Sequence, residues 1–278
     1  MNQRIRVDGG ELEWLYSPDW EYWDYGCCQR HLQMILPFKK TWSTEEKYPL
    51  IVFIPGSAWH KQELYNDIPK LVELAKRGYA IAVLEYRESE IASFPAQVED
   101  VANAFEFIAG KAEQCHLDMD RLYLMGNSSG GHIATMAALM DAHGLCKPLP
   151  RLCGVINECG STDILICAKA PLAPWMKIRP SAALLGIDTI EGNEEIARRA
   201  SAQMYITKNV KIPPMCILHS ENDPIVSVEN SRVLYNKLEE NGHKAEYYEL
   251  ENSDAHSGMT FFCHSILDII ENFCEQNR

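Results

Sequence analysis

One serine stands in a setting that would turn its hydroxyl into a nucleophile. Residues 126–130 read GNSSG, a G-x-S-x-G pattern with Ser128 at its centre. The apolar run Leu122–Met125 before it predicts a buried strand, and Ile133–Met140 after it is rich in Ala, Met and Leu, as a helix would be. Strand, sharp turn and helix are the context in which this pattern forms a nucleophile elbow, which lifts the serine clear of the backbone.

Such an elbow requires glycine at both flanking positions for steric reasons. Side chains at Gly126 and Gly130 would collide with the neighbouring strand and helix. The positive end of the helix dipole would also lie beneath Ser128. Two alternatives remain open. One is an ordinary loop, because Gly and Ser also fill turns. The other is a shifted pattern centred on Ser129, which would put Asn127 where the pattern needs a glycine.

A serine hydroxyl needs a base to take its proton, and the base needs an acid to fix its tautomer. When the serine stands on such an elbow, the acid and the histidine follow it in that order on loops after later strands. Asp223 lies just beyond the predicted strand Pro214–His219, and His256 lies just beyond the predicted strand Ala245–Leu250. The sequence therefore predicts a triad of Ser128, Asp223 and His256.

Other residues compete for two of these positions. Glu221 is the rival acid, and Asp254 is a weaker one because it stands only two residues before the histidine. Three further histidines could serve as the base, although His132 lies on the predicted helix, where packing is its expected role. The rival bases are His60, His132 and His219.

The composition of the 278-residue chain disfavours several classes of partner. A net charge of −13 and a sequence pI near 5.2 argue against binding to nucleic acid or to an anionic membrane. The sequence contains no run of about 18 apolar residues that could span a membrane, and no apolar segment typical of a signal peptide. Ten cysteines without such a signal predict reduced thiols and a cytoplasmic location. We expect a small-molecule partner, and a homo-oligomer remains open.

The cysteines give one weak indication of a metal site. Cys27 and Cys28 are adjacent and are followed by His31. No later C-x-x-C or H-x-x-x-H pattern completes a ligand set, so we predict no metal site and no cofactor. Four other cysteines are expected to be small core residues. They are Cys153, Cys159, Cys167 and Cys216.

Apolar runs and amphipathic segments alternate along most of the chain. This order predicts an α/β fold with a mostly parallel sheet and helices on both faces. The predicted strands are Gln29–Leu36, Leu50–Ile54, Tyr79–Leu84, Leu122–Met125, Cys153–Asn157, Pro214–His219 and Ala245–Leu250. The predicted helices are Glu63–Arg77, Pro95–Gln114, Ile133–Met140, Val228–Glu240 and Thr260–Gln276.

Two segments interrupt this alternation. Residues 1–30 are rich in aromatic residues and predict an irregular arm, and the strand after them should end at Pro37. Residues 158–211 contain several prolines and are too long for a simple connection, so we expect a small cap-like insertion there. No repeat or linker divides the chain, which predicts a single domain over residues 1–278.

Together these motifs resemble the α/β-hydrolase fold, in the branch of serine esterases and lipases that carries H-G-G-x-W after its third strand. That branch includes carboxylesterases similar to hormone-sensitive lipase, feruloyl and acetylxylan esterases, and enzymes similar to kynurenine formamidase. The resemblance spans about residue 30 to the C-terminus. The residues that carry it are Pro55–Trp59, Tyr86 and Arg87, Phe94 and Pro95 with Asp100, Gly126–His132, Asp223 and His256.

In that branch, backbone N–H groups of the H-G-G-x-W turn and of the residue after the nucleophile bind the oxyanion. By position, the resemblance assigns these donors to Ser57, Ala58 and Ser129. We call Pro55–Trp59 the oxyanion turn. It departs from the family pattern because Pro55 replaces the histidine and Ser57 replaces the second glycine. Loss of the histidine removes a side chain that normally braces this turn.

The resemblance implies two-step acyl transfer by a serine carboxylesterase that needs no cofactor. The side chain of Ser57 and the bulky Trp175 and Met176 of the insertion predict a narrow substrate pocket, with Trp59 as a further wall residue. We therefore expect small soluble esters with short acyl groups, such as acetylated sugars. The alternatives are a small-molecule amidase or formamidase, a peptidase, and a non-catalytic binding protein of the same fold.

Overall fold

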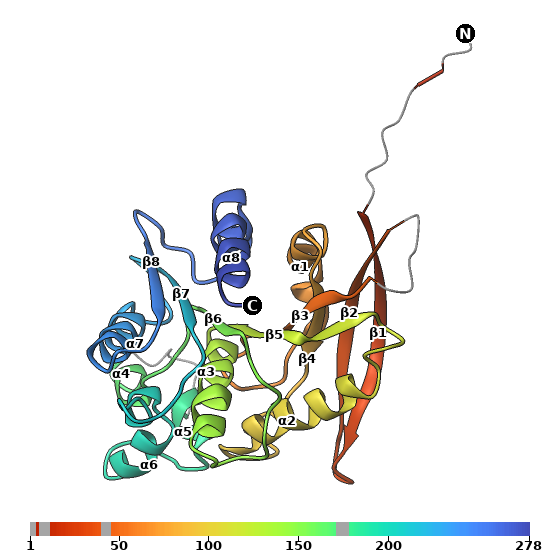
Figure 1. Ribbon diagram of the computed structural model, residues 1–278. Helices are drawn as coiled ribbons and strands as arrows, with labels where there is room; N and C mark the ends of the chain where they lie inside the picture. The colour runs from red at the N-terminus through yellow and green to blue at the C-terminus, as the bar shows by residue number, and fades with distance from the viewer. Residues whose placement is uncertain (1–3, 6–11, 40–45, 171–177) are drawn as a thin grey trace.

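An eight-stranded sheet forms the centre of the computed structural model (Figure 1). The structure describes residues 4–5, 12–39, 46–170 and 178–278. The strands are β1 (Leu12–Asp24), β2 (Gln29–Lys39), β3 (Tyr48–Ile54), β4 (Ala80–Leu84), β5 (Leu117–Asn127), β6 (Gly154–Glu158), β7 (Met215–Ser220) and β8 (Ala245–Leu250). Their spatial order is β1-β2-β4-β3-β5-β6-β7-β8. The β1–β2 and β2–β4 pairs are antiparallel, and the other five pairs are parallel.

Helices cover both faces of this sheet. The main ones are α1 (Ile68–Ala75), α2 (Ala96–Ala109), α3 (Ser129–Ala142), α7 (Glu229–Glu240) and α8 (His264–Gln276). Buried side chains of α2, α3 and α7 belong to one apolar cluster, and those of α1 and α8 belong to the other. Figure 1 shows α1 and α8 on the opposite side of the sheet from α2 and α3. The predicted two-sided arrangement is therefore present.

The central strand β3 illustrates why the buried strands are continuously apolar in sequence. Leu50, Val52 and Ile54 face the cluster that contains α2 and α3. Ile51 and Phe53 face the cluster that contains α1 and α8. All five are 0% exposed. Because both faces are covered, the alternation typical of a one-sided sheet is absent.

The N-terminal segment differs from its prediction. Residues 12–24 form the edge strand β1, whereas the sequence predicted an irregular arm over residues 1–30. β1 pairs with β2 through register shifts between Ser17 and Trp20 and between Glu21 and Trp23. Each shift changes which side chains face which side of the sheet. No period-two pattern therefore runs along this segment, and the strand is hidden in the sequence.

β2 continues to Lys39, two residues beyond the Pro37 at which its end was predicted. Its pairing with β4 covers Leu32–Ile35 and stops there, while its pairing with β1 extends through Pro37. A proline lacks an N–H, so a strand tolerates it where one side has no neighbour to bond. At Pro37 this condition is met on the side of β4.

Two predicted helices are shorter than expected. The segment Glu63–Arg77 forms a 3₁₀ turn, η1 (Leu64–Asn66), before α1. Pro69 stands in the first turn of α1, where a proline suits the start of a helix but not its interior. Likewise, η3 (Met259–Phe262) precedes α8, and the extended backbone of Cys263 separates the two.

The insertion over residues 158–211 contains short helices. They are α4 (Ile164–Cys167), α5 (Pro180–Leu184), α6 (Glu194–Arg199) and the 3₁₀ turn η2 (Ala202–Met204). Ile164, Leu184 and Ala197 are buried and join the apolar cluster of α2 and α3, so the insertion packs on that side of the sheet. Among the described residues, no helix combines the length and the apolar character that crossing a membrane requires.

Candidate active site

Ser128 lies at the sharp turn between β5 and α3. Its backbone has φ +54° and ψ −124°, a conformation that residues other than glycine rarely adopt. Both flanking glycines are required by close contacts. A Cβ on Gly126 would lie 2.4 Å from the carbonyl oxygen of Gly130, and a Cβ on Gly130 would lie 1.9 Å from the carbonyl oxygen of Ile54. The segment therefore has the predicted strand–turn–helix form.

The three residues predicted as a triad meet at one edge of the sheet. His256 Nε2 lies 2.9 Å from Ser128 Oγ, and His256 Nδ1 lies 2.7 Å from Asp223 Oδ2. They follow the C-terminal ends of β5, β7 and β8. An ionised carboxylate only accepts hydrogen bonds, so Nδ1 carries the proton and donates a hydrogen bond to Asp223. The lone pair of Nε2 is then directed at the serine hydroxyl.

Asp223 is held in place by more than the imidazole. Its side chain is 0% exposed. Oδ1 accepts the N–H groups of Ile225 at 2.8 Å and Val226 at 3.0 Å, and Oδ2 lies 3.3 Å from His219 Nε2. Burial alone would raise the pKa of Asp223, but hydrogen bonds from His219 and His256 outweigh it and hold that pKa well below its usual value. The carboxylate is therefore ionised at neutral pH.

The rival acids lie elsewhere. Glu221 is exposed, and its Oε2 accepts the N–H of Asn252 at 3.1 Å. Asp254 is also exposed. Of the three carboxylates considered, Asp223 is the one within hydrogen-bond distance of His256.

Two of the rival bases are occupied by other contacts. His219 is fully buried, and its ring nitrogens bond to Ser231 Oγ at 2.7 Å and to the carbonyl oxygen of Val226 at 3.0 Å. His60 forms a close pair with Glu90 at the surface. The structure brings neither ring to Ser128 Oγ, which bonds to His256.

The third rival, His132, is a structural link. It is 0% exposed on α3. Its Nδ1 accepts the indole N–H of Trp59 at 3.1 Å, so its Nε2 carries the proton and donates to the carbonyl oxygen of Ala200 at 2.8 Å. Burial lowers the pKa of His132 to about 4, which keeps the ring neutral. His132 therefore joins the oxyanion turn to the insertion, in agreement with its predicted packing role.

The oxyanion turn is tied to the elbow by a closed set of hydrogen bonds. The N–H of Ser57 donates to Ser129 Oγ at 2.9 Å. The Ser57 hydroxyl donates to the carbonyl oxygen of His60 at 2.5 Å and lies 2.8 Å from the hydroxyl of Tyr86. The Tyr86 hydroxyl in turn lies 3.2 Å from Ser129 Oγ.

Each hydroxyl in this ring has one proton, and this fixes which oxygen donates in each hydrogen bond. Ser57 has one hydroxyl proton, which goes to the His60 carbonyl, so its oxygen must accept from Tyr86. Tyr86 has then used its own proton, so its oxygen must accept from the Ser129 hydroxyl. Tyr86 is fully buried, and burial raises the pKa of its phenol to about 12 despite the hydrogen bonds with Ser129 and Ser57. The Tyr86 phenol is therefore neutral, and each hydrogen bond of the ring has one defined donor and one defined acceptor.

Strain in the oxyanion turn shows why it needs this support. Ala58 and Trp59 both have positive φ, +53° and +60°, a conformation that persists only where the surroundings impose it. The N–H of Gly56 donates to Asn127 Oδ1 at 2.7 Å, and the Trp59 indole is held by His132. These contacts fix the turn at Gly56 and at Trp59.

The predicted pocket residues have different outcomes. Trp59 is 3% exposed and belongs to the apolar core, where its indole packs edge-on against His132 with the ring centroids 5.3 Å apart. Its role in this structure is to pack the oxyanion turn. Trp175 and Met176 lie outside the described residues.

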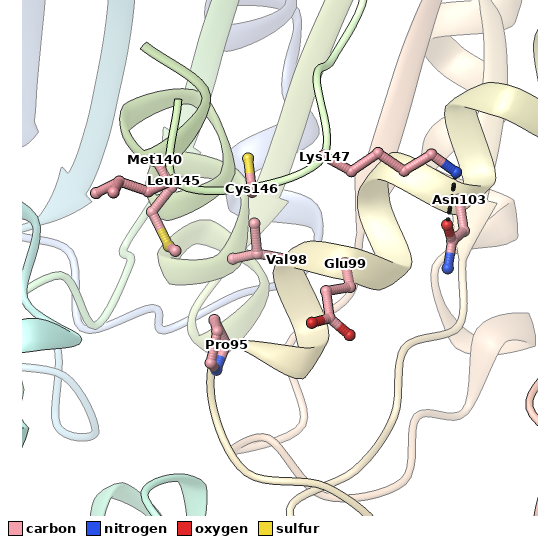
Figure 2. A pocket seen from close by; sticks show the side chains of 8 residues that line it. All are labelled: Pro95, Val98, Glu99, Asn103, Met140, Leu145, Cys146 and Lys147. Atoms are coloured by element: carbon pink, nitrogen blue, oxygen red, sulfur yellow. Dashed lines mark hydrogen bonds between the residues drawn. The ribbon is translucent and has the colours of Figure 1, made fainter. Parts of the chain in front are cut away.

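A cavity of about 290 Å³ lies between α2, α3 and the segment that follows α3 (Figure 2). Val98, Met140 and Leu145 line its apolar part, and Lys147 donates to Asn103 at 3.0 Å on its rim. The described residues that line this cavity include no member of the triad or the oxyanion turn. It is therefore a separate feature from the site of Ser128.

Two residues of the site were not predicted as site residues from the sequence. Tyr86 was noted for the resemblance, but no role followed from its position. Cys159 was expected in the core, and it is fully buried, yet its Sγ also lies 2.7 Å from the carbonyl oxygen of His256. The only available signal was that each follows a predicted strand of the sheet, a position that many inert residues share.

Comparisons with known proteins show which family and which relatives the chain resembles. A family model described as BD-FAE matches residues 36–238. Esterase LipC of Mycobacterium tuberculosis is 22% identical over 200 residues, covering 68% of this chain and 48% of that protein. A probable isoprenylcysteine alpha-carbonyl methylesterase, ICMEL1 of Oryza sativa subsp. japonica, is 23% identical over 222 residues, covering 72% of this chain and 49% of that protein. The chain thus spans about half the length of these curated relatives.

Solved structures show the same fold. A truncated form of a carbohydrate esterase from gut microbiota has a TM-score of 0.76 at 23% identity, covering 95% of this chain and 96% of that chain. An acetyl ester-xyloside bifunctional hydrolase from Caldicellulosiruptor lactoaceticus has a TM-score of 0.72 at 18% identity, covering 92% of this chain and 94% of that chain. With the sheet order described above, this likeness confirms the predicted α/β-hydrolase fold.

Proposed function

Because the chain belongs to the BD-FAE family, whose model matches residues 36–238, we propose that it is a serine carboxylesterase. The observation that carries the proposal is the unbroken line of hydrogen bonds from Ser128 through His256 to Asp223, at 2.9 and 2.7 Å. Curated relatives described as esterases support the reaction class. A hydroxyl aligned on a neutral imidazole, with an ionised acid behind it, is the arrangement that activates a serine for attack on a carbonyl.

Acylation begins when Ser128 Oγ attacks the ester carbonyl and His256 Nε2 takes the hydroxyl proton. Asp223 stabilises the imidazolium that forms, because the carboxylate faces Nδ1 and stays ionised. The tetrahedral intermediate then collapses. His256 gives its proton to the leaving alcohol, and an acyl group remains on Ser128.

The structure favours the N–H groups of Ala58 and Ser129 as the oxyanion donors. Ser129 is the first residue of α3, and the first amides of a helix have no partner within the helix. The N–H of Ser57 already donates to Ser129 Oγ, so it fixes the turn instead of binding substrate. A single oxyanion donor is typically worth about 3–4 kcal/mol of transition-state stabilisation.

Deacylation reverses these roles with water as the nucleophile. His256 removes a proton from water, the acyl carbonyl is attacked, and the second oxyanion uses the same two N–H groups. Ser128 regains its proton and the acid product leaves. Every proton in both halves passes through His256 Nε2, and no step requires a cofactor.

We infer small esters with short acyl groups, such as acetylated sugars, as the substrates. Solved structures described as a carbohydrate esterase and an acetyl ester-xyloside hydrolase support this class. Ser57 also stands where the family pattern has glycine, and from this additional side chain we infer less space beside the oxyanion donors. One methylene in a tight pocket changes selectivity by roughly 1–3 kcal/mol.

Ser128→Ala tests the nucleophile. The rate of p-nitrophenyl acetate hydrolysis should fall by at least about a thousandfold, as triad removal does elsewhere. A fluorophosphonate probe should label the unsubstituted protein and not the variant. Circular dichroism provides the folding control. A variant that kept more than about a thousandth of the rate would show that Ser128 is not the nucleophile.

A series of p-nitrophenyl esters tests the substrate class. We expect kcat/KM to peak at acetate or propionate and to fall by about tenfold or more by octanoate. Acetylated and feruloylated sugars should be compared under the same conditions. A profile that rises with chain length, or that is highest on feruloyl esters, would contradict the narrow pocket while leaving the esterase proposal intact.

A further inference from the structure

A buried thiol lies directly against the predicted base. Cys159 follows the end of β6 and is 0% exposed. Its N–H donates to the carbonyl oxygen of Leu218 at 2.8 Å, and its φ is +43°, so the neighbouring strands fix its backbone in an uncommon conformation. Its Sγ lies 2.7 Å from the carbonyl oxygen of His256. The thiol therefore contacts the backbone of the loop that carries His256.

This thiol completes a set of three metal-ligand atoms. The ligand atoms of Cys159, Asp223 and His256 all lie within 4.8 Å of one another. A tetrahedral zinc ion with Zn–S of about 2.3 Å and Zn–N and Zn–O of about 2.1 Å needs its ligand atoms roughly 3.4–3.6 Å apart. Nδ1 and Oδ2 are now 2.7 Å apart, so binding requires them to separate by less than about 1 Å, and their distances to Sγ, which are at most 4.8 Å, must reach the same range.

The charge balance also suits a divalent cation. In the resting site, the Asp223 carboxylate accepts from both histidines and the Cys159 thiol donates its proton to the His256 carbonyl, so the pair carries one negative charge. When an ion displaces the thiol proton, the thiolate and the carboxylate together balance its two positive charges. A buried neutral assembly avoids the desolvation penalty of an unpaired charge. Thiolate and imidazole ligands favour Zn²⁺ and Cd²⁺ over Mg²⁺ or Ca²⁺.

The histidine loop is the exposed side of this candidate site. His256 is 19% exposed, and neighbouring positions of its loop, Asn252, Asp254 and Ser257, lie at the surface. Entry of an ion from this side would require the imidazole to move outward. The other two ligands stay in place, because Asp223 is anchored by backbone N–H groups and Cys159 by the strand ends.

We propose that Cys159, Asp223 and His256 form an inhibitory site for a soft divalent cation, such as Zn²⁺ or Cd²⁺, which switches the triad off reversibly. The inhibition rests on the proposed esterase function, because the ion takes the base and its acid. The binding itself is independent of that function and can be measured without catalysis.

The proton balance explains the inhibition. The ion bonds to Sγ, the thiol proton leaves to solvent, and the hydrogen bond from Sγ to the His256 carbonyl oxygen is lost. The ion also bonds to Nδ1, whose proton must move to Nε2, since a neutral imidazole keeps one N–H. Nε2 then donates to Ser128 Oγ instead of accepting from it. The serine loses its base while the imidazole stays neutral, and a chelator reverses every step.

Binding is tested first in Ser128→Ala, which cannot turn over ester. Titration with Cd²⁺ should give the ultraviolet charge-transfer absorption of a cadmium–thiolate bond. Cys27→Ser with Cys28→Ser provides the background for every measurement, because those two sulfurs are 3.7 Å apart near the surface and could themselves bridge an ion. In that background the absorption should saturate at one ion per chain. Cys159→Ser should abolish it, and His256→Ala should weaken it.

Inhibition is tested with Zn²⁺ and Cd²⁺ on p-nitrophenyl acetate hydrolysis, each variant being compared with its own metal-free rate. Cys159→Ser loses one of three ligands, so its inhibitory metal concentration should rise by about 10–100-fold or more. A loss of that size already follows when a residue that only hydrogen-bonds to a metal ligand is replaced. Serine keeps a hydroxyl donor for the His256 carbonyl, and Cys159→Ala serves as a second variant should that one fail to fold. Cys27→Ser with Cys28→Ser should remain as sensitive as the unsubstituted protein.

Three results would overturn the proposal. The first is a cadmium–thiolate absorption that survives in Cys159→Ser, or that never appears in the Cys27→Ser and Cys28→Ser background. The second is equal metal sensitivity of hydrolysis with and without the Cys159 thiol. The third is loss of sensitivity in the Cys27 and Cys28 variant alone. A protein that binds Cd²⁺ as described but hydrolyses no ester would refute the proposed function and leave the metal site standing.

Discussion

The two halves of the site are held in different ways. The nucleophile half consists of the elbow and the oxyanion turn, and it is embedded in the core. Tyr86 and Ser129 are 0% and 1% exposed, and the closed hydrogen-bond ring links them to Ser57. The base half lies on a surface loop after β8, a strand whose residues are all half-buried. His256 itself is 19% exposed.

This difference shows which forces position each group. On the nucleophile side, packing and a ring of neutral hydrogen bonds fix backbone conformations that are strained by themselves. On the base side there is little packing, so the imidazole depends on an anchored carboxylate and on the thiol beneath its carbonyl. We therefore expect substitutions in the base half to change catalysis strongly with small losses of stability. Substitutions in the nucleophile half should change both.

The largest effect should come from Asp223→Asn. The amide cannot hold His256 in the tautomer that leaves Nε2 free, and similar changes in other triads lower kcat by about 10⁴-fold. The buried site should keep its shape because the side chains are nearly the same size. Steady-state hydrolysis of p-nitrophenyl acetate measures the loss, and thermal unfolding measures the stability.

Glu221→Gln is the matched control for that variant. Glu221 stands two residues earlier on the same loop, and its carboxylate contacts Asn252 rather than the triad. Its rate should stay close to that of the unsubstituted protein. Greater damage from Glu221→Gln than from Asp223→Asn would reverse the assignment of the acid.

Tyr86→Phe tests the ring of the nucleophile half. Removal of the hydroxyl takes the donor from Ser57 and the acceptor from Ser129, and a buried neutral hydrogen bond is worth about 1–1.5 kcal/mol. We expect kcat to fall by about tenfold, because the oxyanion donors lose their geometry in the transition state. KM should change little. Steady-state kinetics on p-nitrophenyl acetate separates the effect on kcat from the effect on KM.

Tyr123→Phe is the control for this variant. Tyr123 is 1% exposed, and its hydroxyl donates to the carbonyl oxygen of Cys274 in α8 at 2.7 Å, in the apolar cluster on the opposite face of the sheet from Tyr86. Both variants lose one buried tyrosine hydroxyl, so both should lower the melting temperature. If kcat fell equally in the two, the ring would be a stability element without influence on the oxyanion donors.

The sequence predicted the features that are local and those that depend only on the order of the strands. The elbow is encoded within five consecutive residues, and Asp223 and His256 each come after a recognisable strand. The ring was not predictable, because its hydroxyls come from residues 29 and 43 positions apart and no spacing rule joins them. The contact of Cys159 with His256 spans 97 positions. Such contacts exist only once the strands are aligned.

β6 lies between the two halves in the sheet, and its last residue, Glu158, gives the prediction with the smallest expected effect. Glu158 pairs with Asn127 of β5 and with Leu218 of β7. Its side chain is 1% exposed, and among the described residues its Oε1 has no hydrogen-bond partner. Burial raises the pKa of Glu158 from its usual value of about 4.5 to about 8, although the charge of Lys70 opposes the shift. The carboxyl is therefore neutral in the folded protein at neutral pH.

This pKa makes stability fall as pH rises. Between about pH 4.5 and 8 the folded state holds a proton that the unfolded state has released, so the free energy of unfolding decreases with pH, by at most about 1.4 kcal/mol per unit. Glu158→Gln removes the titration. Its melting temperature relative to the unsubstituted protein should rise steadily from about pH 5 to about pH 9, by roughly 2–4 °C for each kcal/mol. Glu113→Gln, at a site 90% exposed, is the control for the loss of a carboxyl group at the surface. A Glu158→Gln difference that stays flat, or shrinks as pH rises, would mean that the carboxyl is ionised in the folded protein and that the buried strand tolerates its charge.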